Sequence, residues 1–185
     1  MLGVVRRMAA YMPHLEQVLL VDQSNRPVGA TTRGDMVIHR QRARNLTHRA
    51  TFIFVANEEN RLFVQQRTTT KDIYPGFYDF APGGVVLAAD ETDQKSAERE
   101  LAEEMGIAGV PVEPLFNFYY ESERTKVWGA AFFARWSGPV RLQAEEVQSF
   151  RLLSLSEIQA EVQAGANYCP DSLAALSQFI SLGKV

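Results

Sequence analysis

The stretch from Gly83 to Ile107 constrains this chain more than any other, because it joins a glycine-containing loop to a segment suited to a helix. Its second half, Gln94–Met105, contains no Gly, Pro or β-branched residue and is rich in residues that favour helices. Gly106 follows, and glycine often ends a helix because it adopts the left-handed conformation. The sequence therefore predicts a helix here, preceded by three suitable N-cap or first-turn residues, Asp90, Thr92 and Asp93.

Three glutamates, Glu100, Glu103 and Glu104, share one face of this helix, since residues three and four apart are neighbours. Carboxylates crowded together near a core are costly unless a cation compensates them, and oxygen ligands suit Mg²⁺ or Mn²⁺. The pattern predicts a divalent-metal site beside a loop that can approach phosphate. A glutamate-rich helix face without such a loop is more often solvated surface, and this is the alternative interpretation. The glutamates flank an apolar stripe made by Ala97, Leu101 and Met105.

The full spacing resembles the Nudix box, G-x5-E-x7-R-E-U-x-E-E-x-G-U, in which U is a bulky aliphatic residue. One position departs, because the box glycine would fall on Val85 and the nearest glycine is Gly84. We therefore expect the loop between Gly84 and Glu91 to be longer by one residue, which loops tolerate. The positions that match in register are Glu91, Arg99, Glu100, Leu101, Glu103, Glu104, Gly106 and Ile107.

Composition limits the class of protein. The 185 residues are 46% hydrophobic and 22% charged, as expected for one globular domain with a core. A net charge of −3 argues against binding of a nucleic-acid polymer, and no run approaches the roughly 18 apolar residues that span a membrane. The single cysteine, Cys169, excludes an intrachain disulfide and favours a cytoplasmic location. Residues 1–12 are a candidate disordered segment.

Strand and helix signals alternate without the regular rhythm of a parallel α/β fold, which favours an α+β class. The Nudix resemblance implies the same class, as an α/β/α sandwich with a mixed β-sheet. We expect one domain over 1–185, with an N-terminal β-hairpin extension over 13–47 and a catalytic core over 48–185. The expected strands are 17–22, 27–31, 50–56, 62–66, 115–120, 127–136 and 149–153, the expected later helices are 156–164 and 170–182, and 68–84 is expected to be mostly loop.

Outside the box, the chain resembles a branch of the superfamily that includes the isopentenyl diphosphate isomerases and a bacterial group known as YfcD-like. The isomerases use a cysteine and a histidine near the loop before the box, but the corresponding loop, Tyr78–Gly84, has neither. His48 matches a position that is a metal ligand in the isomerases, and we interpret it as a structural histidine beside the first core strand. The resemblance is carried by His48–Phe52, Val64–Arg67, Thr70–Asp72, Tyr74–Gly76 and Cys169–Leu173.

The resemblance implies a Mg²⁺-dependent hydrolase that cleaves a nucleoside diphosphate linked to another group X, by attack of water on phosphorus. It implies that Glu100, Glu103 and Glu104 bind the metal, and that Glu103 or Glu100 assists deprotonation of the water. Glu91 and Arg99 are expected to form an ion pair that ties the loop to the helix. Phosphate contacts are expected from the backbone of Gly83 and Gly84 and from the side chains of Arg67 and Lys71.

Glu145 and Glu146 are candidate additional acids in a later loop, and Glu121 and Glu123 are weaker ones. The expected partner is a small-molecule diphosphate, and the N-terminal hairpin offers an interface for a homodimer. Two other functions stay open: an isomerase acting on an isoprenoid diphosphate, and a non-catalytic ligand-sensing module with the same fold. The identity of X is not fixed by the box, which reports chemistry alone.

Overall fold

The structure is a computed structural model that describes residues 15–36, 38–80 and 82–185, so the candidate disordered segment 1–12 lies outside the described residues. Strands β1 (Gln17–Val21) and β2 (Pro27–Thr32) pair antiparallel and form the predicted N-terminal hairpin. A short 3-10 helix, η2 (Arg33–Met36), and helix α1 (Ile38–Ala43) follow it. The described part of the extension therefore contains a hairpin and two short helical elements that lead into the core.

The helix of the glutamate-rich stretch is α2 (Asp93–Met105). It begins after the N-cap Thr92, whose hydroxyl accepts a hydrogen bond from the Lys95 N–H at 3.1 Å. It ends at Gly106, which has the left-handed φ of 68° expected from the sequence. The other elements of the core are β3 (His48–Ala56), β4 (Leu62–Arg67), β5 (Tyr78–Asp79), β6 (Glu113–Glu121), β7 (Lys126–Arg135), β8 (Val147–Leu153), α3 (Leu155–Gln163) and α4 (Pro170–Ser181).

Within the described residues, the strands join one mixed, eight-stranded sheet. Along one path the order is β2-β1-β3-β4-β5, with β7 beside β3, β6 beside β7 and β8 beside β4. The β3 and β7 strands run parallel, from His48 opposite Val127 to Ala56 opposite Arg135, and the other pairs among the described strands are antiparallel. This topology confirms the α+β class.

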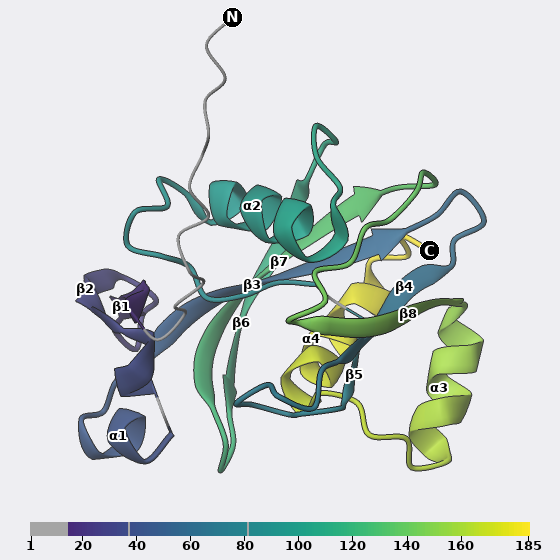
Figure 1. The fold of residues 1–185 in the computed structure, drawn as a ribbon. Coiled ribbons are helices and arrows are strands. Elements are labelled where there is room, and N and C mark those ends of the chain that lie inside the picture. The colour runs from purple at the N-terminus through teal and green to yellow at the C-terminus, as the bar shows by residue number, and fades with distance from the viewer. Residues whose placement is uncertain (1–14, 37, 81) are drawn as a thin grey trace, which may run out of the picture.

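Strand β3 shows how the layers form, because successive side chains of a strand point to opposite faces. Phe54 stacks on Phe179 of α4 with ring centroids 4.2 Å apart, whereas Ile53 and Val55 belong to the cluster that contains Leu101 of α2. Figure 1 shows α2 on one side of the sheet and α3 and α4 on the other. The arrangement confirms the predicted α/β/α sandwich.

Two segments differ from the sequence-based expectation. The segment 68–84 contains β5, a two-residue strand in which Tyr78 pairs with Gln66 and Asp79 with Gln65. Strand β3 begins at His48 rather than at position 50, because its polar first residues are held by tertiary contacts. The guanidinium of Arg49, for example, pairs with the Asp93 carboxylate at 3.0 Å.

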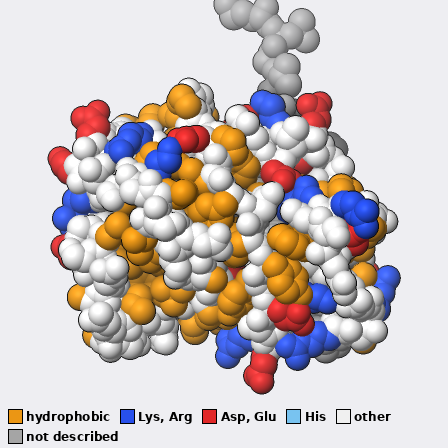
Figure 2. All heavy atoms as spheres, turned by 180° about the vertical axis from the view of Figure 1, so that it is seen from behind, with side chains coloured by type: hydrophobic (Ala, Val, Ile, Leu, Met, Phe, Trp, Pro, Cys, Tyr) orange, Lys and Arg blue, Asp and Glu red, His pale blue; other side chains and the backbone are white. Residues whose placement is uncertain are grey.

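One face of the molecule is shown from behind in Figure 2, where hydrophobic side chains gather over the middle and charged side chains lie mostly toward the edges. The large hydrophobic side chains that are exposed on the molecule as a whole include Val28, Tyr119 and Phe150. Among the described residues, no helix combines the length and the apolar character needed to cross a membrane.

Candidate active site

Helix α2 presents its three glutamates at different depths. Its apolar stripe packs against the sheet, which places Glu104 inside the molecule with 3% exposure. The Glu100 side chain is 12% exposed and that of Glu103 is 53% exposed. Two of the predicted ligands are therefore held at the wall of a pocket, and the third lies at its mouth.

The glycine loop meets both buried carboxylates. The Gly83 N–H donates to Glu104 Oε2 at 3.3 Å, and a Cβ placed on Gly84 would lie 2.6 Å from Glu100 Oε1. The Gly84 carbonyl accepts from the Thr51 N–H of β3 at 2.9 Å, which fixes the loop to the sheet. A side chain at position 84 would therefore displace the Glu100 carboxylate, which lies against the backbone here.

Burial makes these carboxylates hard to ionise in the absence of a cation. Burial, followed by the nearby charge of Glu104, raises the pKa of Glu100 to about 8, although Arg99 opposes the shift. Burial likewise raises the pKa of Glu104 to about 7, against the opposing charge of Lys71 and a hydrogen bond from Gln65 at 3.1 Å. Two acids with raised pKa values in one cleft are typical of a functional site.

Arg99 corrects one sequence-based prediction. Its guanidinium pairs with Asp90 at 3.0 Å, and it also donates to Glu100 at 2.7 Å and Glu103 at 3.2 Å. Glu91, the expected partner, is exposed. Asp90 pairs with Arg99 in place of Glu91 because its carboxylate also accepts a hydrogen bond from the Leu87 N–H at 2.8 Å. This bond holds the Asp90 side chain within the loop, where it faces α2.

The ion pair between Arg99 and Asp90 changes where the extra residue of the box is assigned. Asp90 follows Gly84 at the spacing G-x5-D, so the loop from the glycine to the acid has the ordinary length. The additional residue lies instead between Asp90 and Arg99, where the chain enters α2. With Asp90 as the acid of the box, the extra residue is therefore assigned to the entry of α2 and not to the loop after Gly84.

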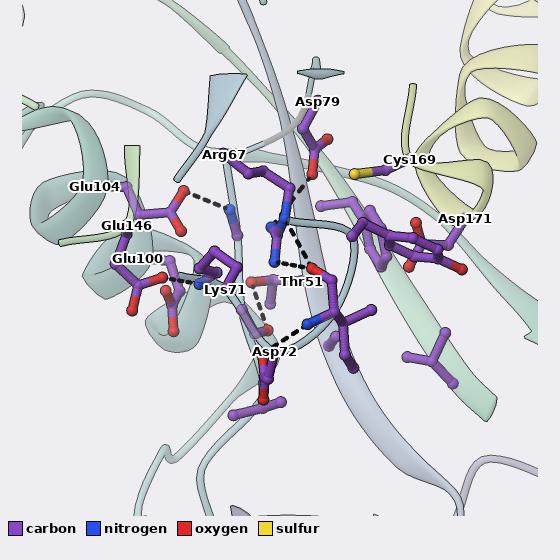
Figure 3. Close-up of a pocket in the computed structure, with 18 of the residues that line it drawn as sticks. Thr51, Arg67, Lys71, Asp72, Asp79, Glu100, Glu104, Glu146, Cys169 and Asp171 are labelled. Atoms are coloured by element: carbon purple, nitrogen blue, oxygen red, sulfur yellow. Dashed lines mark hydrogen bonds and ion pairs between the residues drawn. The ribbon is translucent and has the colours of Figure 1, made fainter. Parts of the chain in front are cut away.

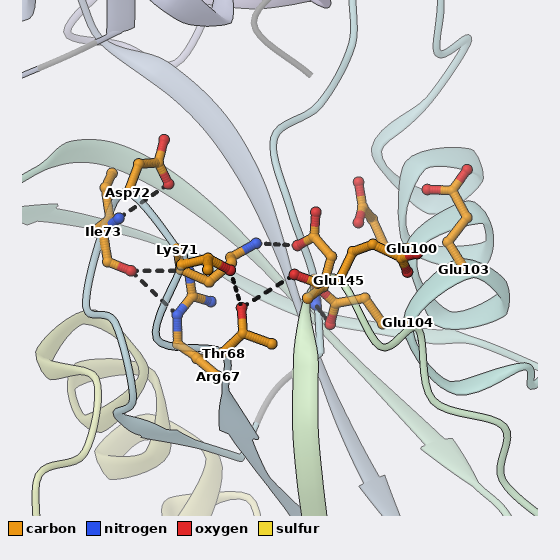
Figure 4. Close-up of polar contacts among 12 residues, drawn as sticks. Arg67, Thr68, Lys71, Asp72, Ile73, Glu100, Glu103, Glu104 and Glu145 are labelled. Atoms are coloured by element: carbon orange, nitrogen blue, oxygen red, sulfur yellow. Dashed lines mark hydrogen bonds and ion pairs between the residues drawn. The ribbon is translucent and has the colours of Figure 1, made fainter. Parts of the chain in front are cut away.

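The two predicted phosphate-contacting cations line the same pocket as the glutamates. Lys71 forms an ion pair with Glu146 (Figure 3), and Arg67 donates to the Ile73 carbonyl at 3.0 Å (Figure 4). Glu146 thus joins the predicted cluster. The other candidate acids do not line this pocket: Glu145 and Glu123 are exposed, and Glu121 accepts from the Tyr119 hydroxyl at 2.5 Å.

His48 is buried at the start of β3, at the edge of the pocket. One amide proton of Gln41 is directed to its Nδ1 at 3.1 Å, and Gln41 also donates to the carbonyl of Lys126. Burial, with a smaller effect of Arg33, lowers the pKa of His48 to about 4. A neutral imidazole that accepts a hydrogen bond at Nδ1 favours the structural interpretation of this residue.

Several residues of the pocket were missed by sequence reasoning. Arg33, paired with Glu16 at 3.2 Å, reaches the pocket from the N-terminal extension, and Tyr74 and Asp171 line it from other segments. Cys169, far from the box in sequence, is buried in this pocket as well, and burial raises its pKa. Asp90, which pairs with Arg99, carried a usable signal in its distance from Gly84. Tyr74, Cys169 and Asp171 lie in segments that carry the family resemblance, but only the tertiary fold brings them to the pocket.

The residues present fit a divalent cation by their chemistry. All the candidate ligands on α2 are carboxylates, two of them are buried beside each other's charge, and the buried Oε1 of Gln65 next to Glu104 has no hydrogen-bond partner among the described residues. Within that part of the chain, no three acidic, histidine or cysteine side chains are already drawn together into a metal cage. Arg99 instead holds Glu100 and Glu103 in this arrangement.

The fold and the site together define the class of protein. Residues 46–171 match the sequence model of the NUDIX domain family, and the chain belongs to this family of hydrolases. It is 42% identical over 162 residues to the uncharacterized Nudix hydrolase YfcD of Escherichia coli K12, covering 88% of this chain and 85% of YfcD. It is 38% identical over 165 residues to an uncharacterized Nudix hydrolase of Pseudomonas aeruginosa, covering 89% of this chain and 94% of the relative.

Solved structures share the fold at low sequence identity. The crystal structure of DR0079 from Deinococcus radiodurans superposes with a TM-score of 0.71 at 21% identity, covering 88% of this chain and 98% of that one. The NUDIX domain of Shewanella oneidensis NrtR, solved as a cocrystal with ADP ribose, gives a TM-score of 0.59 at 16% identity, covering 71% of this chain and 85% of that domain. These similarities confirm the Nudix fold.

Proposed function

We propose that this Nudix hydrolase cleaves a diphosphate linkage in a nucleoside diphosphate derivative or a similar phosphate metabolite, with Mg²⁺ as its cofactor and water as the attacking group. One observation carries the proposal. The buried carboxylates of Glu100 and Glu104 meet the Gly83–Gly84 loop in a pocket that also contains Lys71 and Arg67. Anionic ligands for a cation and cationic side chains for phosphate thus line the same cleft.

Different residues of the pocket are assigned to metal binding, phosphate contact and proton transfer. Glu100, Glu103 and Glu104 would hold Mg²⁺, or Mn²⁺ in its place, and the ion would neutralise phosphate oxygens and lower the pKa of a bound water. Lys71 and Arg67 are placed to orient the phosphates. In the described arrangement Arg99 positions Glu100 and Glu103 through its hydrogen bonds. Glu103, which is half exposed at the pocket mouth, is our choice for the group that accepts a proton from water.

We further propose that residues 48–185 form the catalytic core and that the extension over 13–47 completes the pocket. The NUDIX match begins at residue 46, yet Arg33 lines the cleft. A homodimer is supported by the exposed hydrophobic side chains, among them Val28 of the hairpin. The single, buried cysteine supports a reducing cytoplasm as the compartment.

A panel of diphosphate compounds incubated with Mg²⁺ tests the function, with products identified by chromatography. The panel includes nucleoside triphosphates, nucleotide sugars, dinucleotides and ADP-ribose, the ligand of the NrtR domain. We expect cleavage that requires Mg²⁺ and that falls to the protein-free level in Glu103→Gln. Glu98→Gln, on the same helix but paired outward with Lys95 at 2.9 Å, is the matched control and should keep full activity. Cleavage that survives Glu103→Gln or needs no cation would refute the proposal.

A further inference from the structure

The pocket has a second polar end, away from the glutamates of α2. Figure 3 shows Asp79, Cys169 and Asp171 on the opposite side of the Arg67 side chain from Glu104 and Glu100. This end is built from β5 and from the start of α4, and Tyr74 contributes to the same lining. None of these segments belongs to the glycine loop or to α2.

Most of the hydrogen-bonding capacity of this end is already used within the protein. Asp79 accepts from the Ser172 hydroxyl at 2.7 Å, and Arg67 lies 3.8 Å from its other carboxylate oxygen. Arg67 also donates to the Ile73 carbonyl. Asp79 therefore forms the wall of this end and has little capacity left for a ligand, and Arg67 is held between Asp79 and the Ile73 carbonyl.

Two groups at this end keep capacity for a ligand. The Tyr74 side chain is buried, with 4% exposure of the residue, and its phenolic oxygen has no hydrogen-bond partner among the described residues. The Asp171 carboxylate accepts from the Ser172 N–H at 3.0 Å and forms no ion pair with any described residue. Buried polar groups are normally paired, so an unpaired one beside a cleft points to a ligand.

Electrostatics agrees with this geometry. Burial, followed by the charge of Asp79, raises the pKa of Asp171 to about 6. Burial also raises the pKa of Tyr74 to about 12, and the nearby Ser122 hydroxyl offsets part of that rise. At neutral pH the phenol therefore keeps its proton and can donate, whereas the carboxylate can accept.

We propose that Asp171 and Tyr74 form a polar subsite for the group X, so that the substrates are diphosphates whose X carries hydroxyl or amino groups rather than a hydrocarbon chain. The inference rests on the proposed function, in which the glutamate end handles the diphosphate. A hydroxyl group of X would donate to Asp171 and accept from Tyr74, or bond to either one, and an amino group of X would donate to Asp171. A hydrocarbon X would leave the buried Tyr74 phenol without a partner and would offer no donor to Asp171, and sites built for hydrogen bonds reject ligands that lack them.

Binding to the Glu103→Gln protein with Mg²⁺ tests the subsite without turnover, using calorimetry. The probes are inorganic pyrophosphate, which has no X, geranyl diphosphate, whose X is a hydrocarbon, and a set of nucleotide sugars and dinucleotides. We expect at least one polar compound to bind ten-fold or more tightly than pyrophosphate. That gain should disappear when Asp171→Asn or Tyr74→Phe is added, while pyrophosphate affinity stays within about two-fold.

Tyr119→Phe is the matched control for the phenol, since its hydroxyl contacts Glu121 outside the pocket, and it should keep the gain. Circular dichroism identifies a variant that fails to fold. If either Asp171→Asn or Tyr74→Phe does so, the binding data for the other substitution test the inference. The inference is overturned if geranyl diphosphate binds as tightly as the best polar compound, if no polar compound exceeds pyrophosphate, or if the gain survives both substitutions. Hydrolysis by the wild-type protein is scored separately, so loss of the polar preference with intact hydrolysis removes only this inference.

Discussion

At the scale of single residues, the site depends on which acid holds Arg99. The spacing of the box, counted back from Arg99, predicts Glu91 as the acid that pairs with this arginine. The same spacing counted forward from Gly84 predicts Asp90. The structure selects Asp90, whose side chain is 12% exposed and lies 3.0 Å from the guanidinium. Because Arg99 also contacts Glu100, loss of the Arg99–Asp90 ion pair would change the position of a buried carboxylate of the site.

Adjacent substitutions separate the two acids. We expect Asp90→Asn to lower the free energy of unfolding by about 1.5–3 kcal/mol, because it removes the charge from a largely buried, hydrogen-bonded pair. Glu91→Gln, one residue away and exposed, should change it by less than about 0.5 kcal/mol. Urea unfolding at neutral pH measures both. Equal effects of the two substitutions would contradict the assignment of Asp90.

His48 should make the fold sensitive to acid. Its pKa is lowered to about 4 in the folded protein, so it stays neutral there while the unfolded chain binds a proton below its ordinary pKa of 6.5. Its contribution to stability is therefore complete above pH 6.5 and is lost as the pH falls from 6.5 toward 4. The loss is on the order of 3 kcal/mol, at about 1.4 kcal/mol for each pKa unit.

Unfolding free energies at several pH values between 7 and 4 check this expectation. The decrease over that range should be smaller in His48→Gln than in the wild-type protein by roughly the same 3 kcal/mol. Other groups titrate in both proteins, so only the difference between them reports on His48. Parallel pH profiles would show that the buried imidazole accepts a proton in the folded state as readily as in the unfolded chain.

At the scale of elements, the sequence predicts those with strong local signals. Helix α2 has a capping residue, an unbroken run of helix formers and a terminal glycine, and all three act as expected. Strand β5 was missed because a two-residue strand within a loop is held only by its partner β4. The same limit applies to the site, since Glu100 and Glu104 follow from helical spacing alone, whereas Tyr74 and Asp171 meet only in the folded chain.

The contact between the glycine loop and α2 yields a steric prediction. Gly84 has no unusual φ, so an alanine there meets chiefly the Glu100 carboxylate, 2.6 Å from the added Cβ. We expect Gly84→Ala to destabilise the protein by about 1–3 kcal/mol, the usual cost of overpacking. In a Glu100→Ala background the clash is absent, so the same substitution should cost less than about 0.5 kcal/mol.

A double-mutant cycle from urea unfolding measures this coupling. A cost of Gly84→Ala that is the same with and without Glu100 would show that the loop is constrained by something other than the carboxylate. Mg²⁺ titrations by calorimetry on the same proteins add a functional readout. Displacement of Glu100 by the alanine methyl group should weaken Mg²⁺ binding ten-fold or more, and unchanged affinity would remove Glu100 from the proposed ligands.

At the scale of the whole molecule, the extension and the core form one continuous structure. The hairpin is outside the NUDIX match, yet Leu19 donates to the Val86 carbonyl at 2.9 Å and the Ala88 N–H donates to Gln17 at 2.8 Å. The hairpin thus braces the segment that follows the glycine loop. Together with Arg33 in the pocket, these contacts indicate that the extension shapes the cleft in which the reaction is proposed to occur.

The central claim is that this cleft uses water to break a diphosphate. It is tested most directly by running the reaction with Mg²⁺ in oxygen-18-labelled water, on the best compound of the panel, and locating the label by mass spectrometry. We predict one labelled oxygen in a phosphate-containing product and none in recovered substrate. Products without label, or an isomerised diphosphate released intact from an isoprenoid substrate, would contradict the hydrolase account and favour the isomerase chemistry of the related branch.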